Sequence, residues 1–231
     1  MLSGAGIDLL AIFTGDGTMN AAISALAGWG GAVMVLPGGT MNLLSHRMHG
    51  DADVATIVER MSRGACRRVR PKIATCDAGC AFAGLLAGPG TAWNSVRETM
   101  REKDLLALAE ETKDAFAETT GGPPVRCAEP SLGKPEGYPL LEITPSERGL
   151  QIDAYHAESP GEFVQQSWAV LRHDFRNGPH DRLGLPDSVR LENPDGATPI
   201  LLDGEPASLK NGSTISLAPC DVDLIATDHG Y

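Results

Sequence analysis

The chain has 231 residues, a formal net charge of −11 at pH 7 and a hydrophobic content of 42%. This length and apolar content exclude a disordered chain and allow one large domain or two small ones. The acidic balance argues against nonspecific nucleic-acid binding and against a polybasic membrane anchor. No apolar run approaches the roughly 20 residues of a membrane span, and the N-terminus shows no signal peptide. The five cysteines are scattered, which favours a reduced, cytoplasmic setting and membrane contact that is peripheral at most.

An apolar run at Ile7 to Phe13 predicts a buried parallel strand. Gly15 and Gly17 then flank Asp16 in a tight turn, and Thr18 is a good N-cap for a helix. The unpaired N–H groups at such a helix start favour an anion such as phosphate. An ordinary strand-to-helix turn with a capping threonine fits the same spacing.

A second unit of the same kind follows. Ala32 to Leu36 reads as a strand, Pro37-Gly38-Gly39 as a loop, and Thr40 as the cap of a helix that runs to about Met48. Two such units in succession predict neighbouring parallel strands with right-handed crossovers. Both loops then lie at the carboxyl ends of their strands, where open α/β sheets bind ligands.

The pattern changes along the rest of the chain. Asp51 to Arg63 predicts a helix capped by Asp51, Lys72 to Leu86 a broken strand, and 91–100 and 104–118 two further helices. From Thr119 onward, short strand-like runs separated by Pro, Gly, Asp and Asn predict an antiparallel sandwich or barrel. These runs are 140–143, 149–156, 163–171, 188–191, 198–202, 214–217 and 222–226.

Three motifs carry a resemblance to a known family. TGDGTMN at Thr14 to Asn20 is similar to the GGDGTxN motif of the diacylglycerol kinase catalytic family, which includes bacterial lipid kinases and sphingosine kinases. LPGGTMN at Leu36 to Asn42 resembles that family's PxGTxN motif, and LDGEP at Leu202 to Pro206 resembles a segment of its second domain. The motifs stand in the family's order and bracket most of the chain.

The resemblance implies an α/β nucleotide-binding domain with a parallel sheet, of the NAD kinase and diacylglycerol kinase type, and a mainly antiparallel β-sandwich second domain. We expect residues 1–70 to form a partial ATP-binding domain and 71–231 a lipid-substrate domain with inserted helices. The family's first strand–loop–helix region is absent here, so an N-terminally truncated form with an exposed sheet edge is expected. Two motif positions also differ, because Thr14 replaces a glycine and Leu43 an aspartate.

The function that the resemblance implies is transfer of the γ-phosphoryl group of ATP, with Mg²⁺, to a diacylglycerol or a sphingoid or other long-chain alcohol. Glu205 is expected to accept the hydroxyl proton, with Asp203 tied into the Mg²⁺ network and Asp16 binding Mg²⁺ directly or through water. If the segment is extended, Asp203 and Glu205 point to the same face, whereas a hairpin turn is the other interpretation of Asp-Gly-Glu. The residues expected at the nucleotide are Thr14, Gly15, Asp16, Gly17, Thr18, Asn20, Gly38, Gly39, Thr40 and Asn42.

Other candidate sites have plainer alternatives. Leu150-x-x-Asp153-x-Tyr155 resembles the family's structural magnesium segment, with one carboxylate and two main-chain carbonyls as ligands. A plain strand with an outward aspartate is the alternative. His46-x-x-His49 is predicted to be a solvated helix end rather than a metal site. The basic run 67–70 is predicted to be a solvated strand edge, with a phosphate- or lipid-facing patch as the alternative.

Two further functions remain open on the sequence. One is a non-catalytic or weakened homologue that binds nucleotide or lipid without turnover, and the other is an NAD kinase-like enzyme that shares GGDGT. The expected partners are a lipid alcohol substrate and, transiently, a membrane surface. No nucleic acid is expected, and the exposed sheet edge makes a homodimer a further prediction.

Overall fold

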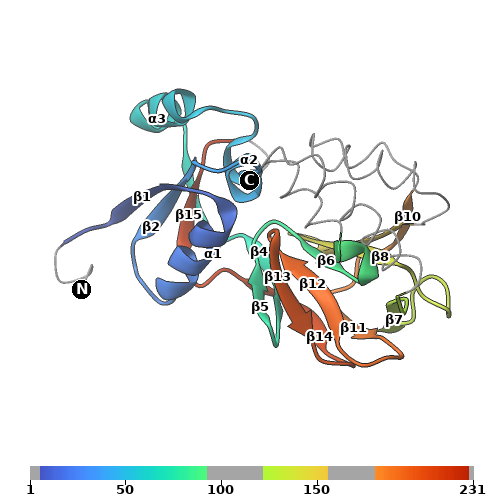
Figure 1. The fold of residues 1–231 in the computed structure, drawn as a ribbon. Helices are drawn as coiled ribbons and strands as arrows, with labels where there is room; N and C mark the ends of the chain where they lie inside the picture. The colour runs from blue at the N-terminus through green and yellow to red at the C-terminus, as the bar shows by residue number, and fades with distance from the viewer. Residues whose placement is uncertain (1–5, 93–121, 156–179, 229–231) are drawn as a thin grey trace, which may run out of the picture.

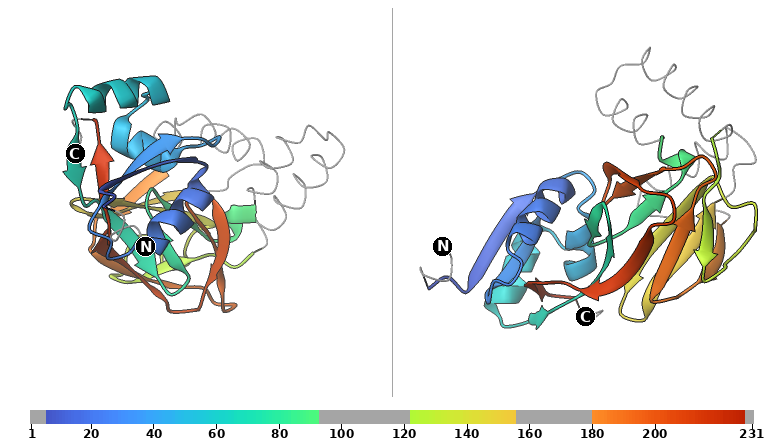
Figure 2. Two further views of the ribbon diagram at one scale, coloured as in Figure 1. Left: turned by 90° about the vertical axis from the view of Figure 1, so that its left-hand side faces the viewer. Right: turned by 90° about the horizontal axis from the view of Figure 1, so that it is seen from below.

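The structure is a computed structural model, and it describes residues 6–92, 122–155 and 180–228. Strands dominate this part of the chain and form three sheets within it, as Figure 1 shows. A sheet with helices lies at one end of the molecule, and two antiparallel sheets lie at the other (Figure 2). The predicted combination of an α/β part and a β-sandwich part is therefore confirmed.

The first sheet carries the glycine-rich turns. Its strands stand in the order β1 (Leu9–Thr14), β2 (Ala32–Pro37), β15 (Asp223–Ala226) and β3 (Arg67–Val69). β1 and β15 both pair parallel with β2, and β3 pairs antiparallel with β15. The prediction of neighbouring parallel strands from the two strand–turn–helix units is confirmed.

Three helices cover the two faces of this sheet in the described part of the chain. They are α1 (Asp16–Ala25), α2 (Leu43–His49) and α3 (Val54–Ser62). Met19 of α1 and Met48 of α2 are buried in one apolar cluster with Val33 of the central strand. Ile57 of α3 packs into a separate cluster with Met34 of the same strand. Because β2 has helices on both faces, its run of consecutive apolar residues is what a doubly covered strand requires.

The predicted starts of the helices are wrong. α1 begins at Asp16 with Gly15 as its extended N-cap, so Thr18 lies inside the first turn. α2 begins at Leu43 because Asn42 before it adopts a left-handed conformation with φ 51°, and Thr40 stands outside the helix. A threonine after a glycine was thus a misleading signal in both units.

The third helix also starts later than predicted. Its N-cap is Asp53, whose carboxylate accepts a hydrogen bond of 2.8 Å from the N–H of Thr56. The carboxylate of Asp51, the predicted cap, instead lies 3.1 Å from Nδ1 of His46. Of two aspartates two residues apart, the one that reaches a first-turn N–H sets the start of the helix.

The predicted second domain, 71–231, is wrong at its C-terminal end. β15 inserts between β2 and β3 of the first sheet instead of joining the antiparallel sheets. Val222 and Leu224 are fully buried in the cluster that also holds α1 and α2. An apolar run buried on both sides suits the centre of a parallel sheet better than a half-exposed sandwich strand.

The two antiparallel sheets pack face to face. The six-stranded sheet has the order β10 (His180–Gly184), β9 (Gly149–Tyr155), β8 (Leu140–Ser146), β6 (Leu85–Ala87), β12 (Thr198–Leu202) and β13 (Glu205–Leu209). The five-stranded sheet has the order β5 (Gly79–Ala81), β4 (Lys72–Cys76), β14 (Thr214–Pro219), β11 (Ser188–Glu192) and β7 (Arg126–Glu129).

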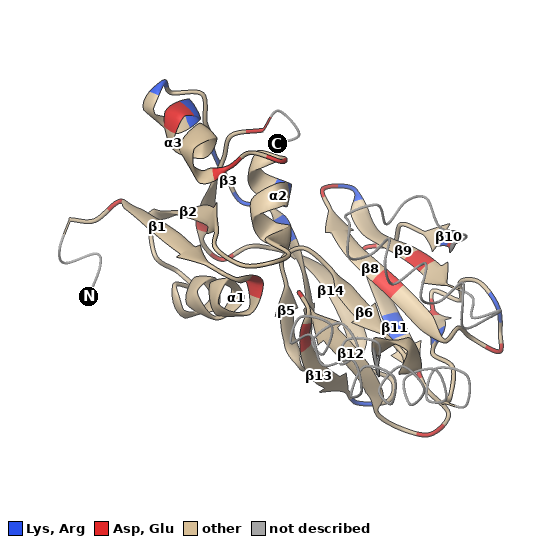
Figure 3. Cartoon of the chain, turned by 45° about the horizontal axis from the view of Figure 1, so that its top comes forward, with Lys and Arg blue, Asp and Glu red and all other residues tan. Residues whose placement is uncertain are grey.

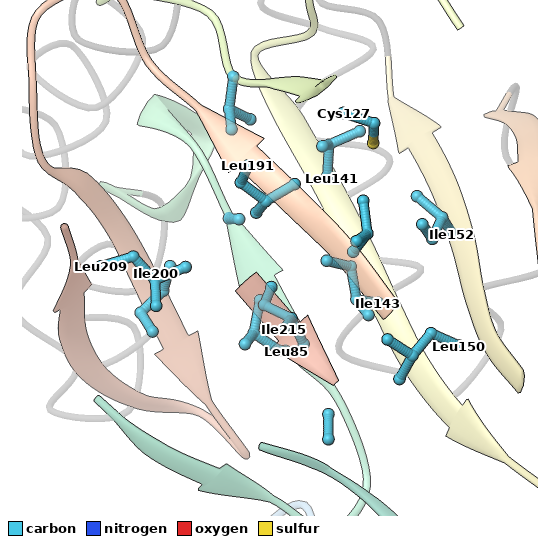
Figure 4. Close-up of a cluster of buried hydrophobic side chains, with 14 of the residues drawn as sticks. Leu85, Cys127, Leu141, Ile143, Leu150, Ile152, Leu191, Ile200, Leu209 and Ile215 are labelled. Atoms are coloured by element: carbon cyan, nitrogen blue, oxygen red, sulfur yellow. The ribbon is translucent and has the colours of Figure 1, made fainter. Parts of the chain in front are cut away.

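Side chains from both antiparallel sheets meet in one core, which Figure 4 shows. Leu85, Ile143 and Ile152 of the first and Leu191 and Ile215 of the second are almost completely buried there. This core confirms the predicted sandwich. The strands β7, β10 and β13 were not predicted.

Some predictions lie outside the described residues. These are the strand at 163–171, the helix at 104–118 and most of the helix at 91–100, although Pro89–Ala92 forms a short 3-10 helix. Over the ranges that the structure describes, no helix is both long and apolar enough to cross a membrane.

Candidate active site

The two glycine-rich turns meet at the carboxyl ends of β1 and β2. We call Thr14–Thr18 the first glycine turn and Pro37–Thr40 the second glycine turn. Thr14 and Pro37 are partners in the parallel register of the two strands. The N–H of Gly38 donates to the carbonyl of Thr14 at 3.2 Å. The backbones are so close that a Cβ atom on Gly39 would lie 2.6 Å from the Cα of Gly15, so only glycine fits at this contact.

The second glycine turn folds back on Asn42. The N–H of Gly39 donates to Oδ1 of Asn42 at 2.7 Å, and Nδ2 of Asn42 donates to the carbonyl of Gly39 at 2.9 Å. The N–H groups of both Gly38 and Gly39 are therefore engaged within the protein. We expected these N–H groups to bind phosphate, but in this structure they are bonded to Thr14 and Asn42. The bond from Gly38 to Thr14 supports the first glycine turn.

The first glycine turn opens α1. As in any helix, the N–H groups of its first turn have no partner within the helix, which makes this end favourable for an anion. Asp16 is the first helical residue, and its Oδ1 accepts from the N–H of Leu44 at 3.3 Å. This bond ties the start of α1 to α2. Figure 3 shows the acidic end of α1 directed toward β5 and β13.

The LDGEP segment reaches the same place through a hairpin. Leu202 ends β12, Glu205 begins β13, and the two are paired across the turn. Asp203 and Gly204 between them have φ 48° and 91°, which is the left-handed pair that a tight hairpin of this kind requires. The expectation of one extended strand with both carboxylates on the same face is wrong, and the hairpin interpretation is right.

Asp203 is buried in a cradle of donors. Its Oδ1 accepts from the N–H groups of Ala83 and Gly84 at 2.8 and 3.0 Å. Its Oδ2 accepts from the N–H of Phe82 and from Nδ2 of Asn20, each at 2.8 Å. Burial raises the pKa of this carboxyl group, and the four donors oppose that rise.

Four donors leave the Asp203 carboxylate no free acceptor site for a metal ion or a substrate proton. These bonds exclude direct binding of Mg²⁺ by Asp203 and make this side chain a structural bracket, while an indirect tie to the Mg²⁺ network stays a prediction. The bracket joins α1 to the β12–β13 hairpin across 183 positions of sequence.

Glu205 is the carboxylate that the bracket presents. Its side chain is exposed and lies against Gly17 in the first turn of α1. A Cβ atom on Gly17 would be 2.6 Å from its Cδ and 2.8 Å from its Cγ. Residues from the two ends of the chain thus converge on one helix start.

Sequence reasoning missed three contributors to this site. Arg47 of α2 donates to the carbonyl of Phe82, next to the donor cradle. The carbonyl of Cys80 accepts from Nδ2 of Asn20 at 2.8 Å, and its thiol lies 3.6 Å from Oγ of Ser24. The segment after β5 carries no motif, and its contribution is mainly backbone N–H groups, which no residue pattern reveals.

The predicted magnesium segment does not gather its three ligands. Leu150 and Tyr155 stand five residues apart in the extended strand β9, so their carbonyls are about 16 Å apart. One cation cannot bind both. Asp153 is buried, with its carboxylate bonded to Arg182 at 3.3 Å and to Gln151 at 2.5 Å. In the described part of the chain, no three His, Cys, Asp or Glu residues are grouped so as to hold a metal ion.

One histidine of α2, His49, differs from the prediction of a solvated helix end. His49 is 1% exposed, with Nδ1 2.9 Å from Oγ1 of Thr227 and Nε2 2.9 Å from the carbonyl of Val35. Because the carbonyl only accepts, Nε2 carries a proton. Burial lowers the pKa of His49 to about 4. The ring therefore fastens α2 to the first sheet.

The basic run after α3 lies on a strand edge. Arg68 and Arg70 each bond the carboxylate of Asp223 at 2.9 Å on the neighbouring strand. The predicted solvated strand edge is confirmed for these two side chains, which are about half exposed.

Comparisons with known proteins agree with this geometry. Residues 2–72 match the family model "Diacylglycerol kinase catalytic domain". None of the curated proteins compared with the chain matches it. Among solved structures, a diacylglycerol kinase from Bacillus anthracis Sterne is 15% identical with a TM-score of 0.60, over 96% of this chain and 77% of that one.

A second structure from the same organism, described provisionally as a diacylglycerol kinase, is 16% identical with a TM-score of 0.61, over 96% of this chain and 78% of that one. At this identity the likeness shows the fold. The matched segment and this fold are consistent with the diacylglycerol kinase catalytic-domain family, whose model covers residues 2–72 of the chain.

Proposed function

We propose that this protein transfers the γ-phosphoryl group of ATP to the hydroxyl group of a lipid alcohol, either a diacylglycerol or a sphingoid or other long-chain alcohol. The observation that carries the proposal is the contact between Glu205 and Gly17. It brings a carboxylate from the second domain to the helix start where the first glycine turn offers N–H groups to an anion.

The chain's own residues divide the work as follows. N–H groups of the first turn of α1 hold phosphate oxygens, since this ten-residue helix begins directly after the turn. Glu205 accepts the proton of the acceptor hydroxyl as its oxygen bonds to phosphorus, which makes it the general base. Asp203 holds the hairpin that presents Glu205 and does not react.

Asp16 is the residue that fits Mg²⁺. The structure describes one hydrogen bond to its carboxylate, so acceptor capacity remains for a hard cation. Kinase sites hold Mg²⁺ through one or two carboxylates and substrate phosphates, so a larger carboxylate cluster is not required. When bound, Mg²⁺-ATP supplies the electrophilic phosphorus and the leaving group of the reaction.

The lipid acceptor implies brief contact with a membrane surface, from which the alcohol is taken. Because the net charge is −11, we propose that this contact rests on apolar groups rather than on attraction to anionic lipids.

Labelled ATP tests the proposal. The full chain is incubated with γ-labelled ATP, Mg²⁺ and detergent micelles of a diacylglycerol, sphingosine or a long-chain alcohol, with NAD as a separate acceptor. The expected result is label in one or more lipids and none in NAD. Label in NAD alone would favour an NAD kinase-like enzyme. No label, together with a melting temperature raised by ATP or lipid, would favour a binding protein without turnover.

A further inference from the structure

Gly17 is a glycine whose added Cβ atom would meet a side chain, that of Glu205, rather than backbone. It is not among the glycines with positive φ, so its backbone conformation is open to alanine. Alanine also suits a helix better than glycine does. A Cβ atom would overlap Cγ and Cδ of Glu205, so this exposed side chain, and not the backbone, would have to move.

The other glycine beside Asp16 lacks this contact. A Cβ atom on Gly15 would meet only the Cα of Gly39, at 3.6 Å, which is an ordinary contact. The two glycines of one motif therefore have different constraints, and only that of Gly17 comes from the β12–β13 hairpin.

α1 also contacts the β12–β13 hairpin at a second residue, Asn20. Asn20 follows Gly17 by three residues, so both lie on one face of α1. Its amide bonds Asp203 at 2.8 Å, and Asp203 is two residues before Glu205. α1 thus fixes the turn through Asn20 and leaves room for the next side chain at Gly17.

We propose that Gly17 is a positioning residue, a seat that sets where the Glu205 carboxylate stands relative to the first glycine turn. This inference rests on the proposed function for its kinetic meaning, but the seat itself is a property of the folded chain. A methyl group at Gly17 pushes the carboxylate away while leaving the phosphate-binding N–H groups in place.

The test compares Gly17→Ala with Gly30→Ala. Gly30 has open space around it and is not among the positive-φ glycines, so it is a matched control. The first readout needs no turnover: carboxyl ¹³C NMR of Glu205, assigned with Glu205→Gln. We expect its resonance to shift in Gly17→Ala and to stay unchanged in Gly30→Ala. An unshifted resonance in Gly17→Ala overturns the proposal.

The second readout is kinetic. We expect kcat to fall roughly 100-fold in Gly17→Ala, with KM for ATP changed less than about threefold, and no further loss when Gly17→Ala is added to Glu205→Gln. A raised KM for ATP with unchanged kcat would overturn the proposal in favour of phosphate approach. If the wild-type chain transfers no phosphoryl group, the proposed function fails, while the NMR result still decides the seat.

A loss of stability can also be assigned. If Gly17→Ala lowers the melting temperature, the double variant Gly17→Ala/Glu205→Ala should restore it, because the clash is removed. A melting temperature that stays low in the double variant would place the clash elsewhere and contradict the seat.

Discussion

Gly17 of the first glycine turn faces a carboxylate from the far end of the chain, whereas Gly39 of the second faces the backbone of Gly15. The N–H groups of Gly38 and Gly39 are engaged within the protein, whereas the N–H groups of the first turn of α1 have no partner within their helix. Similar sequences after two parallel strands thus do different work. The first glycine turn forms the site, and the second supports it from behind.

The supports of the two turns differ as well. The first is braced by the bracket at Asp203 on the hairpin, and the second by His49 on α2, which reaches Val35 of β2. Each of these two supports can be removed separately, and the contact between the two turns can be disrupted as well. The three tests follow in order of decreasing expected effect.

Removal of the first brace should have the largest effect on stability. Asp203→Ala leaves four donors around a buried site without their acceptor, and we expect a loss of roughly 3 kcal/mol or more in the free energy of unfolding. Urea denaturation measures it. Asp195→Ala on an exposed turn is the control, with a change within about 0.5 kcal/mol. Equal losses in the two variants would contradict the bracket.

Separation of the two turns comes next. In Gly39→Ala the new methyl group meets backbone that cannot rotate away, at 2.6 Å from the Cα of Gly15. We expect a loss of about 1–3 kcal/mol and weaker phosphoryl transfer, because the first glycine turn must move. Gly30→Ala should lose neither. Unchanged unfolding of Gly39→Ala would show that the turns are not in contact.

The contribution of His49, the support of the second turn, to the free energy of unfolding is smaller and depends on pH. The pKa of His49 is lowered from 6.5 to about 4 by burial, so below pH 6.5 the unfolded state binds more protons than the folded state. Stability from the neutral ring is complete above pH 6.5 and falls as pH approaches 4, by at most about 1.4 kcal/mol per pH unit.

His49→Gln should flatten this part of the stability profile, measured by urea denaturation between pH 6.5 and 4. Gly30→Ala, which removes no titratable group, should keep the wild-type slope. If the profiles of wild type and His49→Gln run parallel, the ring does not titrate as its surroundings indicate.

The sequence predicted the parts of the fold that local pattern governs. Apolar runs followed by Gly15 and by Gly38 predicted β1 and β2, and the runs after Thr119 predicted β8, β9, β11, β12 and β14 of the sandwich. It did not predict the sheet that receives β15, because a short apolar strand carries no record of its distant partner. The helix starts were missed since Thr18 and Thr40 look like caps, while the actual caps depend on backbone angles at Gly15 and Asn42.

The sequence predicted which residues gather at the candidate site, but it did not predict what each of them does there. Asp16, Asn20, Asp203 and Glu205 do converge. Which carboxylate is buried, however, depends on the backbone N–H groups of residues 82–84, and N–H groups are the same in every sequence. The seat at Gly17 was also hidden, because a glycine beside a phosphate-type turn is already expected for other reasons.

The proposed role of the Glu205 carboxylate is tested most directly by the single-turnover rate of phosphoryl transfer in Glu205→Gln. We expect the rate to fall about 10²–10⁴-fold with the dissociation constant for ATP unchanged, while Glu59→Gln, on the exposed surface of α3, keeps the wild-type rate. A Glu205→Gln variant that transfers phosphate as fast as the wild-type chain would contradict the role of this carboxylate.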